Sequence, residues 1–213
     1  MSDGNARIDK KLIKDRGEDW ILVTPIPPEL AEEVGAFSAR RRISLRHIIG
    51  DRDQREKLLA RPIRPDRIAA ILIDGEVIGC ISYRVDGKGS IIPQIRQFWA
   101  EYGLASGTLR WLGTELTLRR GRRHELYIEG FAVASEARGM RLGSALLRWV
   151  SGEVTRRGKR AWRAEMPDGH HQAARAYERS GAEVKRLVPL GPFAPLIGSK
   201  AMTLYRWTPP TQK

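Results

Sequence analysis

Cysteine and histidine are scarce in this chain, and their scarcity argues against several classes of protein. The single cysteine, Cys80, cannot form a disulfide within the chain. Histidine occurs only 4 times, and His124, His170 and His171 have no set of carboxylates or cysteines at metal-ligand spacing. We therefore expect no disulfide scaffold, no zinc finger and no metal cofactor.

Long apolar runs are also missing. The run Ile68–Ile73 is far shorter than the roughly 20 residues that a membrane helix needs. Residues 1–19 are polar and charged, which predicts a flexible arm and not a signal peptide. We expect a soluble cytoplasmic protein that has no membrane partner.

Positive charge, by contrast, is abundant. The 213 residues include 38 lysines and arginines against 25 aspartates and glutamates, a net charge of +13. Such a surplus favours anionic partners such as nucleic acid or a phosphorylated cofactor. Arginines cluster at 40–42, 119–123 and 156–160, but no helix-turn-helix, RNA-recognition motif or zinc finger accompanies them. A basic nucleic-acid-binding or regulatory protein is therefore kept as an alternative, although we expect no nucleic-acid partner.

Hydrophobic periodicity predicts strands mixed with helices. Asp74-Gly75 supplies the positive φ angles of a type I′ turn, so 68–83 is predicted to be a β-hairpin. The basic run 40–42 is expected on the solvated face of a helix, and the aromatic stripe of 95–118 in the core. The pattern predicts one α/β (α+β) domain over 20–208 with a tail at 209–213. The expected strands are 20–24, 68–73, 76–83, 126–133, 160–166, 182–188 and 201–207, and the expected helices are 27–34, 40–49, 95–118 (one or two), 142–157 and 172–180.

The most informative segment is a glycine-containing loop, 138–144, between a strand and a helix. The first turn of a helix has N–H groups without internal partners and partial positive charge. Gly139 and Gly143 let this backbone approach a ligand closely, and Arg138 and Arg141 add formal charge. The loop therefore predicts a seat for a diphosphate. Its spacing matches neither the dinucleotide-binding nor the P-loop pattern, and a helix start with a packing glycine is the alternative.

Two motifs in this order resemble those of the GCN5-related N-acetyltransferases, the GNAT superfamily. Residues 133–147 read V-x4-R-G-x-x-L-G-S-A-L-L, which is similar to the family's acetyl-CoA-binding motif. Residues 168–181 read D-x-H-x-x-A-x-x-x-Y-E-x-x-G, which is similar to the family's N-x-x-A-x-x-x-Y-E-x-x-G-F helix. The resemblance covers roughly residues 20–208 and departs at Arg141, His170 and Ala182, where the family has glycine, asparagine and phenylalanine. A positive φ at Arg141 would cost about 1 kcal/mol.

The resemblance implies a fold and an activity. The fold is a central mixed, mostly antiparallel sheet of six to seven strands, flanked by helices on both faces and splayed at the cofactor site. The activity is transfer of an acetyl group from acetyl-CoA to a small-molecule or protein primary amine, without metal, by direct attack in a ternary complex. Segments 27–50 and 95–118 frame the acceptor, and a homodimer or a CoA-binding protein without turnover is compatible. The implied cofactor-binding residues are Phe131, Ala132, Val133, Arg138, Gly139, Met140, Arg141, Leu142, Gly143, Ser144, His170 and Ala173.

The same resemblance implies catalytic roles. The amides of Phe131 and Val133 would bind the pantetheine, and the Val133 N–H would polarise the thioester carbonyl. Tyr177 would act as the general acid for the leaving thiolate. Regular alternation from Glu125 places Glu129 on one face with Phe131 and Val133, so Glu129 is predicted to be the general base, usually through water. A surface carboxylate at Glu129 and a half-buried helix tyrosine at Tyr177 are the alternatives.

Overall fold

The computed structural model describes residues 13–17, 19–42, 45–118, 123–137, 139–167, 171–191, 194 and 199–210. Most of the predicted arm, the end of the predicted tail, Arg138 and His170 lie outside the described residues.

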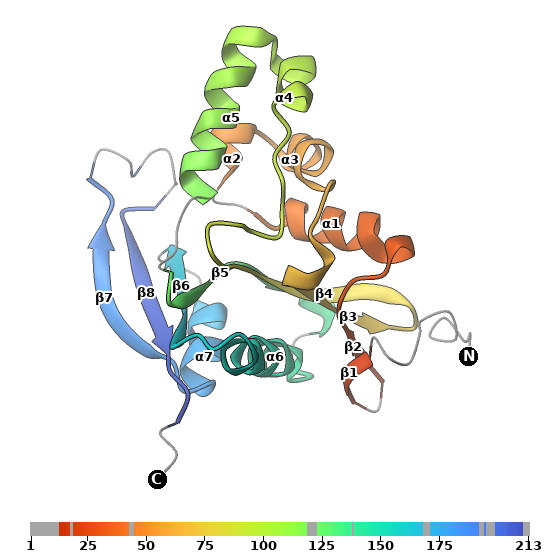
Figure 1. Cartoon of the computed structure of the whole chain (residues 1–213), viewed down its shortest axis with the longest axis vertical. Coiled ribbons are helices and arrows are strands. Elements are labelled where there is room, and N and C mark those ends of the chain that lie inside the picture. The colour runs from red at the N-terminus through yellow and green to blue at the C-terminus, as the bar shows by residue number, and fades with distance from the viewer. Residues whose placement is uncertain are drawn as a thin grey trace.

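One 8-stranded sheet runs through the described chain in the order β1-β2-β3-β4-β5-β6-β8-β7 (Figure 1). Neighbouring strands are antiparallel except β5 and β6, which confirms a mixed, mostly antiparallel sheet. The sheet has one strand more than the six to seven predicted. This strand is β1, which lies in the predicted arm and pairs with β2 at the edge of the sheet. Its polar sequence has no alternation of apolar residues that would indicate a strand. The strands are β1 Ile13–Arg16, β2 Ile21–Val23, β3 Ile68–Ile73, β4 Glu76–Arg84, β5 Glu125–Val133, β6 Ala161–Pro167, β7 Glu183–Pro189 and β8 Ala201–Trp207.

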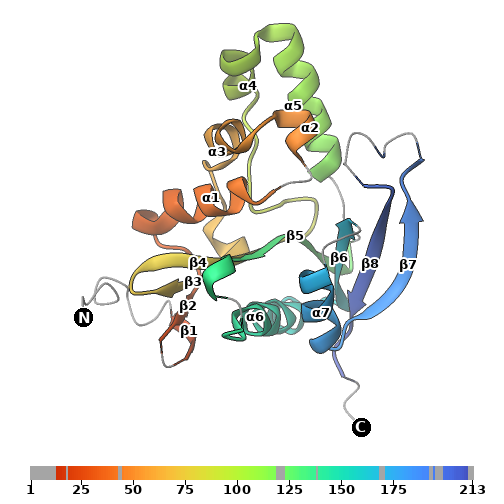
Figure 2. The same ribbon diagram turned by 180° about the vertical axis from the view of Figure 1, so that it is seen from behind.

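Helices cover both faces of the sheet. Helices α6 and α7 lie on one face and α1 to α5 on the other, as both views show (Figures 1 and 2). The helix predicted at 40–49 is confirmed only for the short α2; α1 extends to Arg40 before it. Of the basic run, Arg41 is exposed as predicted, whereas Arg42 is buried. The helices are α1 Ala31–Arg40, α2 Arg46–Ile49, α3 Arg52–Leu59, α4 Ile95–Tyr102, α5 Leu104–Leu118, α6 Leu142–Arg156 and α7 His171–Arg179, with 3₁₀ turns η3 Pro28–Leu30, η5 Pro65–Arg67 and η6 Ser135–Ala137.

The hairpin β3–β4 lies in the interior of the sheet, as predicted. Asp74 and Gly75 connect the strands with φ angles of 50° and 85°, the positive values of a two-residue hairpin turn. Strand β3 divides two apolar clusters. Ala69 and Ile71 face α6, whereas Ile68, Ala70 and Leu72 face α1. Burial on both faces explains why this strand reads as a continuous apolar run.

Helices α4 and α5 form a third apolar cluster together with α2 and α3. Phe98 belongs to this core, and Tyr102 and Trp111 pack against it. Trp99 and most leucines of α5 are exposed, Leu109 to 72 % and Leu116 to 61 %. The prediction that the stripe is core is therefore confirmed for three of its aromatic residues and wrong for Trp99 and for Leu104, Leu109, Leu112 and Leu116.

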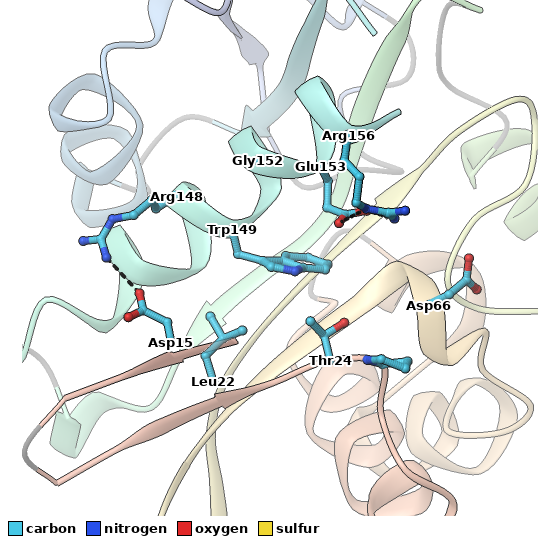
Figure 3. A pocket seen from close by; sticks show the side chains of 10 residues that line it. Asp15, Leu22, Thr24, Asp66, Arg148, Trp149, Gly152, Glu153 and Arg156 are labelled. Atoms are coloured by element: carbon cyan, nitrogen blue, oxygen red, sulfur yellow. Dashed lines mark hydrogen bonds and ion pairs between the residues drawn. The ribbon is translucent and has the colours of Figure 1, made fainter. Parts of the chain in front are cut away.

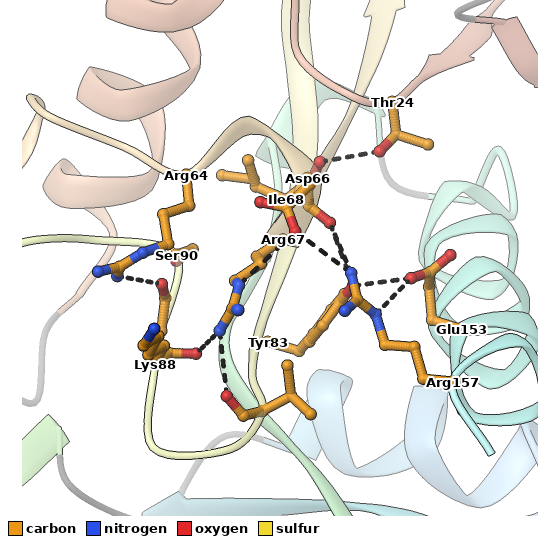
Figure 4. A network of polar contacts seen from close by, with 12 residues as sticks. Thr24, Arg64, Asp66, Arg67, Ile68, Tyr83, Lys88, Ser90, Glu153 and Arg157 are labelled. Atoms are coloured by element: carbon orange, nitrogen blue, oxygen red, sulfur yellow. Dashed lines mark hydrogen bonds and ion pairs between the residues drawn. The ribbon is translucent and has the colours of Figure 1, made fainter. Parts of the chain in front are cut away.

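A polar network ties the end of α6 to the sheet (Figure 4). The Tyr83 hydroxyl on β4 donates to Glu153 Oε2 at 2.7 Å, and Arg157 Nε donates to the same oxygen at 3.1 Å. Arg156 Nε donates to Glu153 Oε1 at 2.7 Å. Burial alone would raise the pKa of Glu153, but the hydrogen bonds from Arg156, Tyr83 and Arg157 lower it below the usual value.

Acid should weaken this network. A carboxyl with a depressed folded-state pKa stabilises the fold above its ordinary pKa of about 4.3, and this stability is lost as the pH falls through the folded-state pKa. We expect Glu153→Gln to lower the free energy of unfolding by about 1–2 kcal/mol at neutral pH, and by less at low pH, in urea titrations. Glu32→Gln is the control, since its ion pair with Arg61 is exposed. An equal loss at both pH values would contradict the prediction.

Candidate active site

Strands β5 and β6 part in the middle of the sheet. Their parallel pairing ends at Ile128 and Ala164, although β5 continues to Val133 and β6 to Pro167. Beyond that point β6 pairs with β8, and β5 pairs only with β4. One edge of β5 from residue 129 onward therefore has no partner strand among the described residues. We call this opening the β5–β6 gap.

The register of β5 on β4 decides which amides face the gap. The Ala134 N–H donates to the Ile78 carbonyl at 2.8 Å. Hydrogen-bonded and non-hydrogen-bonded pairs alternate in antiparallel strands, so Ala132 also turns its amide toward β4. Phe131 and Val133, in register with Ile81 and Gly79, direct their N–H and C=O groups away from β4 and into the gap. These are the two amides that the sequence singled out.

A β-bulge at Glu129 changes the facing of this strand. Ser82 is in register with Gly130 and Tyr83 with Ile128, so Glu129 is the additional residue. Ile128 belongs to the apolar cluster beneath α6, and Phe131 and Val133 pack against the same cluster. The predicted shared face for Glu129, Phe131 and Val133 is therefore wrong, because the bulge reverses the alternation beyond it.

The Glu129 side chain lies on the other face, in a buried network. One oxygen accepts hydrogen bonds from Arg84 Nε and Nη2, both at 2.8 Å. The other accepts from the Ser90 N–H at 2.7 Å and the Ser90 hydroxyl at 3.0 Å. The side chain is only 1 % exposed. This carboxylate is occupied by its own neighbours, unlike the accessible base that we predicted.

Arg42, at the end of α1, completes the network around the bulge. Its Nη1 donates to the Glu129 carbonyl at 3.3 Å and its Nη2 to the Ser82 hydroxyl at 3.2 Å. Burial lowers the pKa of this guanidinium, while the charge of Glu129 opposes that change. The contacts join the main chain of the bulged residue to the Ser82 side chain on β4, and so fix the shape of β5 at the start of the gap.

The loop before α6 presents an uncapped helix N-terminus. Gly139 has φ of 92° and Arg141, the N-cap residue, has φ of 59°; no side chain of a described residue caps the helix. Gly139, Met140 and Arg141 are exposed, whereas Leu142 is buried beneath them and Ser144 is half-buried. A Cβ on Gly143 would lie 3.1 Å from Phe131 Cζ. The glycine thus lets the first turn of α6 approach β5.

Arg141 has the left-handed conformation, with positive φ, that costs a residue with a Cβ about 1 kcal/mol. We expect Arg141→Gly to raise the free energy of unfolding by about 1 kcal/mol, because glycine adopts positive φ without that penalty. Chemical denaturation beside Arg141→Ala, which keeps a Cβ but loses the charge, checks this. A gain in Arg141→Ala as large as that in Arg141→Gly would show that charge, and not backbone strain, is responsible.

Tyr177 on α7 lies within an aromatic cluster next to the gap. Its ring centroid is 5.4 Å from that of Phe131, 5.7 Å from that of Trp162 and 5.1 Å from that of Tyr205. The residue is 5 % exposed, and burial raises the pKa of its hydroxyl. No described residue makes a hydrogen bond with this hydroxyl, although buried tyrosines usually find a partner. Ala173, one turn earlier, packs against the same cluster.

The known proteins that this chain resembles are acetyltransferases. Residues 38–182 match the profile of the Acetyltransferase (GNAT) family. The chain belongs to the GNAT family. It is thus an acyltransferase, and its fold is the GNAT fold. No curated protein matches the sequence.

Solved structures agree on the fold of this acetyltransferase. A GNAT-family acetyltransferase from Streptococcus pneumoniae is 13% identical, with 89% of this chain and 99% of that chain covered and a TM-score of 0.54. The protein yncA from Salmonella typhimurium, solved with its cofactor acetyl-CoA, is 13% identical, with 92% and 96% covered and a TM-score of 0.54. A GNAT-family protein from Desulfovibrio desulfuricans is 15% identical, with 89% and 98% covered and a TM-score of 0.51.

A cavity of about 660 Å³ in this acetyltransferase lies apart from the predicted cofactor residues (Figure 3). It opens between β2 and the second half of α6, with Trp149 against Leu22 and Thr24, and the Arg148–Asp15 ion pair at one end. None of the residues that line it belongs to the gap or the loop. Within the described ranges, no helix is long and apolar enough to cross a membrane, and no three potential metal ligands cluster.

Sequence reasoning missed Arg42 and Arg84 in this acetyltransferase. Arg42 ends a basic run that is typical of a solvated surface, and Arg84 closes a strand. The only hint in the sequence is that a charged residue, Arg84, ends an otherwise mostly apolar strand. Their partners come from separate elements, so no local pattern indicates the network.

Proposed function

We propose that this chain transfers the acetyl group of acetyl-CoA to a primary amine by direct attack in a ternary complex. The observation that carries the proposal is the convergence of two sets of main-chain donors. The amides of Phe131 and Val133 face the β5–β6 gap, and the uncapped first turn of α6 approaches the same strand through Gly143. A ligand with amide and carbonyl groups at one end and phosphates at the other fits both sets.

The main chain performs the binding and polarising work in this proposal. The Phe131 N–H binds the pantetheine arm, and the Val133 N–H stabilises the negative charge that develops on the thioester oxygen. Residues 139–144 hold the pyrophosphate, with Arg138 and Arg141 adding charge. The remaining cofactor contacts are assigned to Ala132, His170 and Ala173 from the family resemblance. When bound, acetyl-CoA supplies an activated acetyl group.

Tyr177 serves as the proton donor. The amine nitrogen forms a bond with the acetyl carbon as the carbon–sulfur bond breaks, and the Tyr177 hydroxyl gives its proton to the departing sulfur. Three observations support this role: the tyrosine contacts Phe131, its hydroxyl has no described partner, and its raised pKa keeps it protonated. Solvent then returns a proton to the Tyr177 oxygen.

Glu129 receives a different role from the one its sequence position suggested. We assign it, with Arg84 and Arg42, to holding the bulge that directs Phe131 and Val133 into the gap. The acceptor must still be a neutral amine, and an amine of pKa about 10.4 is unprotonated only about once in 2,500 molecules at pH 7. Because the buried Glu129 carboxylate is already saturated with donors, the amine gives its proton to solvent water before or during attack.

The excess positive charge gives less support to the nucleic-acid alternative once the arginines are located. Several bind the chain's own carbonyls: Arg55 contacts Gly50, Arg64 contacts Gly89, and Arg67 contacts Val85. Arginines used in this way do not form a surface stripe for phosphates.

Two measurements test the proposal. Calorimetric titration with acetyl-CoA should give saturable binding, and release of free thiol in the presence of an amine library should give turnover. Arg141→Glu should weaken acetyl-CoA binding about tenfold or more, because it places a negative charge at the pyrophosphate seat. Arg148→Glu, an exposed arginine on the same helix beside the distant cavity, is the matched control. Absence of acetyl-CoA binding would overturn the proposal, and binding without turnover on any amine would reduce it to cofactor binding.

A further inference from the structure

Arg163 on β6 is half-buried and poorly satisfied. Its side chain is 13 % exposed, and its buried Nε has no hydrogen-bond partner among the described residues. It forms an ion pair with Glu165, in which Nη2 and Oε1 are separated by 3.7 Å, a distance beyond that of a hydrogen bond. Its other contact is with the ring of Tyr127, whose centroid is 5.7 Å from Arg163 Cζ.

The side chain lies on the face of the sheet opposite α6 and α7. Trp162 and Ala164 belong to the apolar cluster beneath those helices, so Arg163 between them and Glu165 beyond them face the other way. This is the face that carries α1 to α5 (Figure 1). The β5–β6 gap begins directly after Ala164, so Arg163 stands at its entrance and Glu165 at its first open position.

Electrostatics at this position call for an anion. Arg206 on β8 is in register with Arg163, and like charges directly opposite each other on one face are destabilising. Arg206 is compensated by Glu125, which accepts a hydrogen bond from Arg206 Nε at 2.9 Å. The buried Nε of Arg163 has no such bond to any described residue, although a guanidinium offers a planar fork of donors that matches a carboxylate. A carboxylate from outside the chain would supply the missing hydrogen bonds.

Resting on the proposed function, we propose that the acceptor is a free amino acid whose carboxylate is bound by Arg163. The order of charges along β6 agrees with this polarity. Arg163 and Glu165 are two residues apart on one face, about 7 Å along the strand, with the acidic residue nearer the gap. An amino acid bound with its carboxylate at Arg163 can therefore place its amine on the Glu165 side, toward the gap.

The inference distinguishes classes of acceptor that acetyl transfer to a primary amine does not by itself distinguish. Polyamines lack a carboxylate and add positive charge beside Arg163 and Arg206. A lysine side chain or N-terminus within a protein has no free carboxylate close to the reacting amine. Both classes are predicted to be poor acceptors, whereas a free amino acid satisfies the guanidinium and carries the amine at the required end.

Matched acceptors test the inference directly. L-Leucine is compared with leucinamide and 3-methylbutylamine, L-phenylalanine with phenylalaninamide and 2-phenylethylamine, and the other amino acids are screened alongside. We expect removal or amidation of the carboxylate to lower kcat/KM about ten- to hundredfold, the usual effect of losing a charge-assisted hydrogen-bonded pair. Carboxylate-free amines that equal or exceed every amino acid would overturn it.

Variants then assign the effect to Arg163. Arg163→Ala should lower kcat/KM for the preferred amino acid ten- to hundredfold and change that for its decarboxylated amine less than about threefold. Arg163→Lys should recover part of the loss, because the ammonium keeps the charge but not the fork. Arg148→Ala, far from the gap, should change neither. Equal losses on both acceptors would show a structural role and contradict the inference.

Binding provides a readout that is independent of turnover. Calorimetric titration of the CoA-loaded protein with the same amino acids should give weaker binding in Arg163→Ala than in the unaltered chain. If acetyl-CoA binds and amines are acetylated regardless of a carboxylate, this inference fails and the proposed function stands. If acetyl-CoA does not bind, the proposed function itself fails.

Discussion

Phenylalanine in place of Tyr177 should lower kcat about a hundred- to ten-thousandfold while leaving the fold intact. The proton donor is lost, but the ring that packs against Phe131, Trp162 and Tyr205 remains. Because no described residue hydrogen-bonds the hydroxyl, its removal leaves no described partner unpaired. The melting temperature should therefore change by less than about 2 °C.

The matched control is Tyr205→Phe, which removes a neighbouring hydroxyl from the same cluster. It should retain most of the activity and the same affinity for acetyl-CoA. The measurements are steady-state kinetics of thiol release, calorimetric titration with acetyl-CoA and thermal unfolding. A Tyr177→Phe enzyme with unchanged kcat would remove this residue from the mechanism, and a large drop in stability would assign it to the core alone.

The pH dependence gives a further check on Tyr177. Burial raises the pKa of its hydroxyl above the ordinary value, so the hydroxyl stays protonated across the pH range in which the amine becomes neutral. The rate should rise with pH as the amine loses its proton, without an alkaline decline from Tyr177. A decline below the ordinary tyrosine pKa of about 10 that disappears in Tyr177→Phe would contradict the burial seen here.

Alanine in place of Glu129 should lower the free energy of unfolding by about 3–5 kcal/mol, the usual consequence of removing one member of a buried ion pair. It leaves Arg84 buried without its carboxylate partner, the Ser90 N–H without its acceptor and the buried charge of Arg42 without the nearby negative charge of Glu129. Glu129→Gln keeps the size and an acceptor oxygen, so its loss should be smaller. Urea denaturation measures both, with the exposed Glu183→Gln as a control that should show no change.

Kinetics of Glu129→Gln distinguish the bulge from a base. If Glu129 holds β5, the substitution should raise the Kd for acetyl-CoA and lower kcat, because both depend on the Phe131 and Val133 amides, and the pH profile should keep its shape. Arg42→Lys should produce the same two changes in weaker form, since its contacts reach the same residue. Loss of the acidic limb of the profile with unchanged acetyl-CoA affinity would instead restore the role of base.

Much of the fold could be predicted because its signals are local. The Asp74-Gly75 turn, the apolar run of β3 and the helical period of α6 each lie within one element, and each was placed correctly. A positive φ at Arg141 was one possibility that the sequence raised, because the family has glycine at this position. The structure shows that Arg141 has this conformation. Strand β1 and the exposed side of α5 could not, since an edge strand depends on its neighbour and the burial of a helix face depends on what packs against it.

The amino-acid sequence by itself determined the family and pointed to the strand–loop–helix proposed to seat a diphosphate and to the tyrosine of the second motif, because these depend on residue types at short spacing. Only the tertiary structure decided where Glu129 faces, that Arg42 is buried and that the buried Nε of Arg163 has no hydrogen-bond partner in the described part of the chain. A bulge is a property of two strands in register, and the compensation of a charge depends on side chains from several elements, so neither leaves a periodic signal along one chain segment.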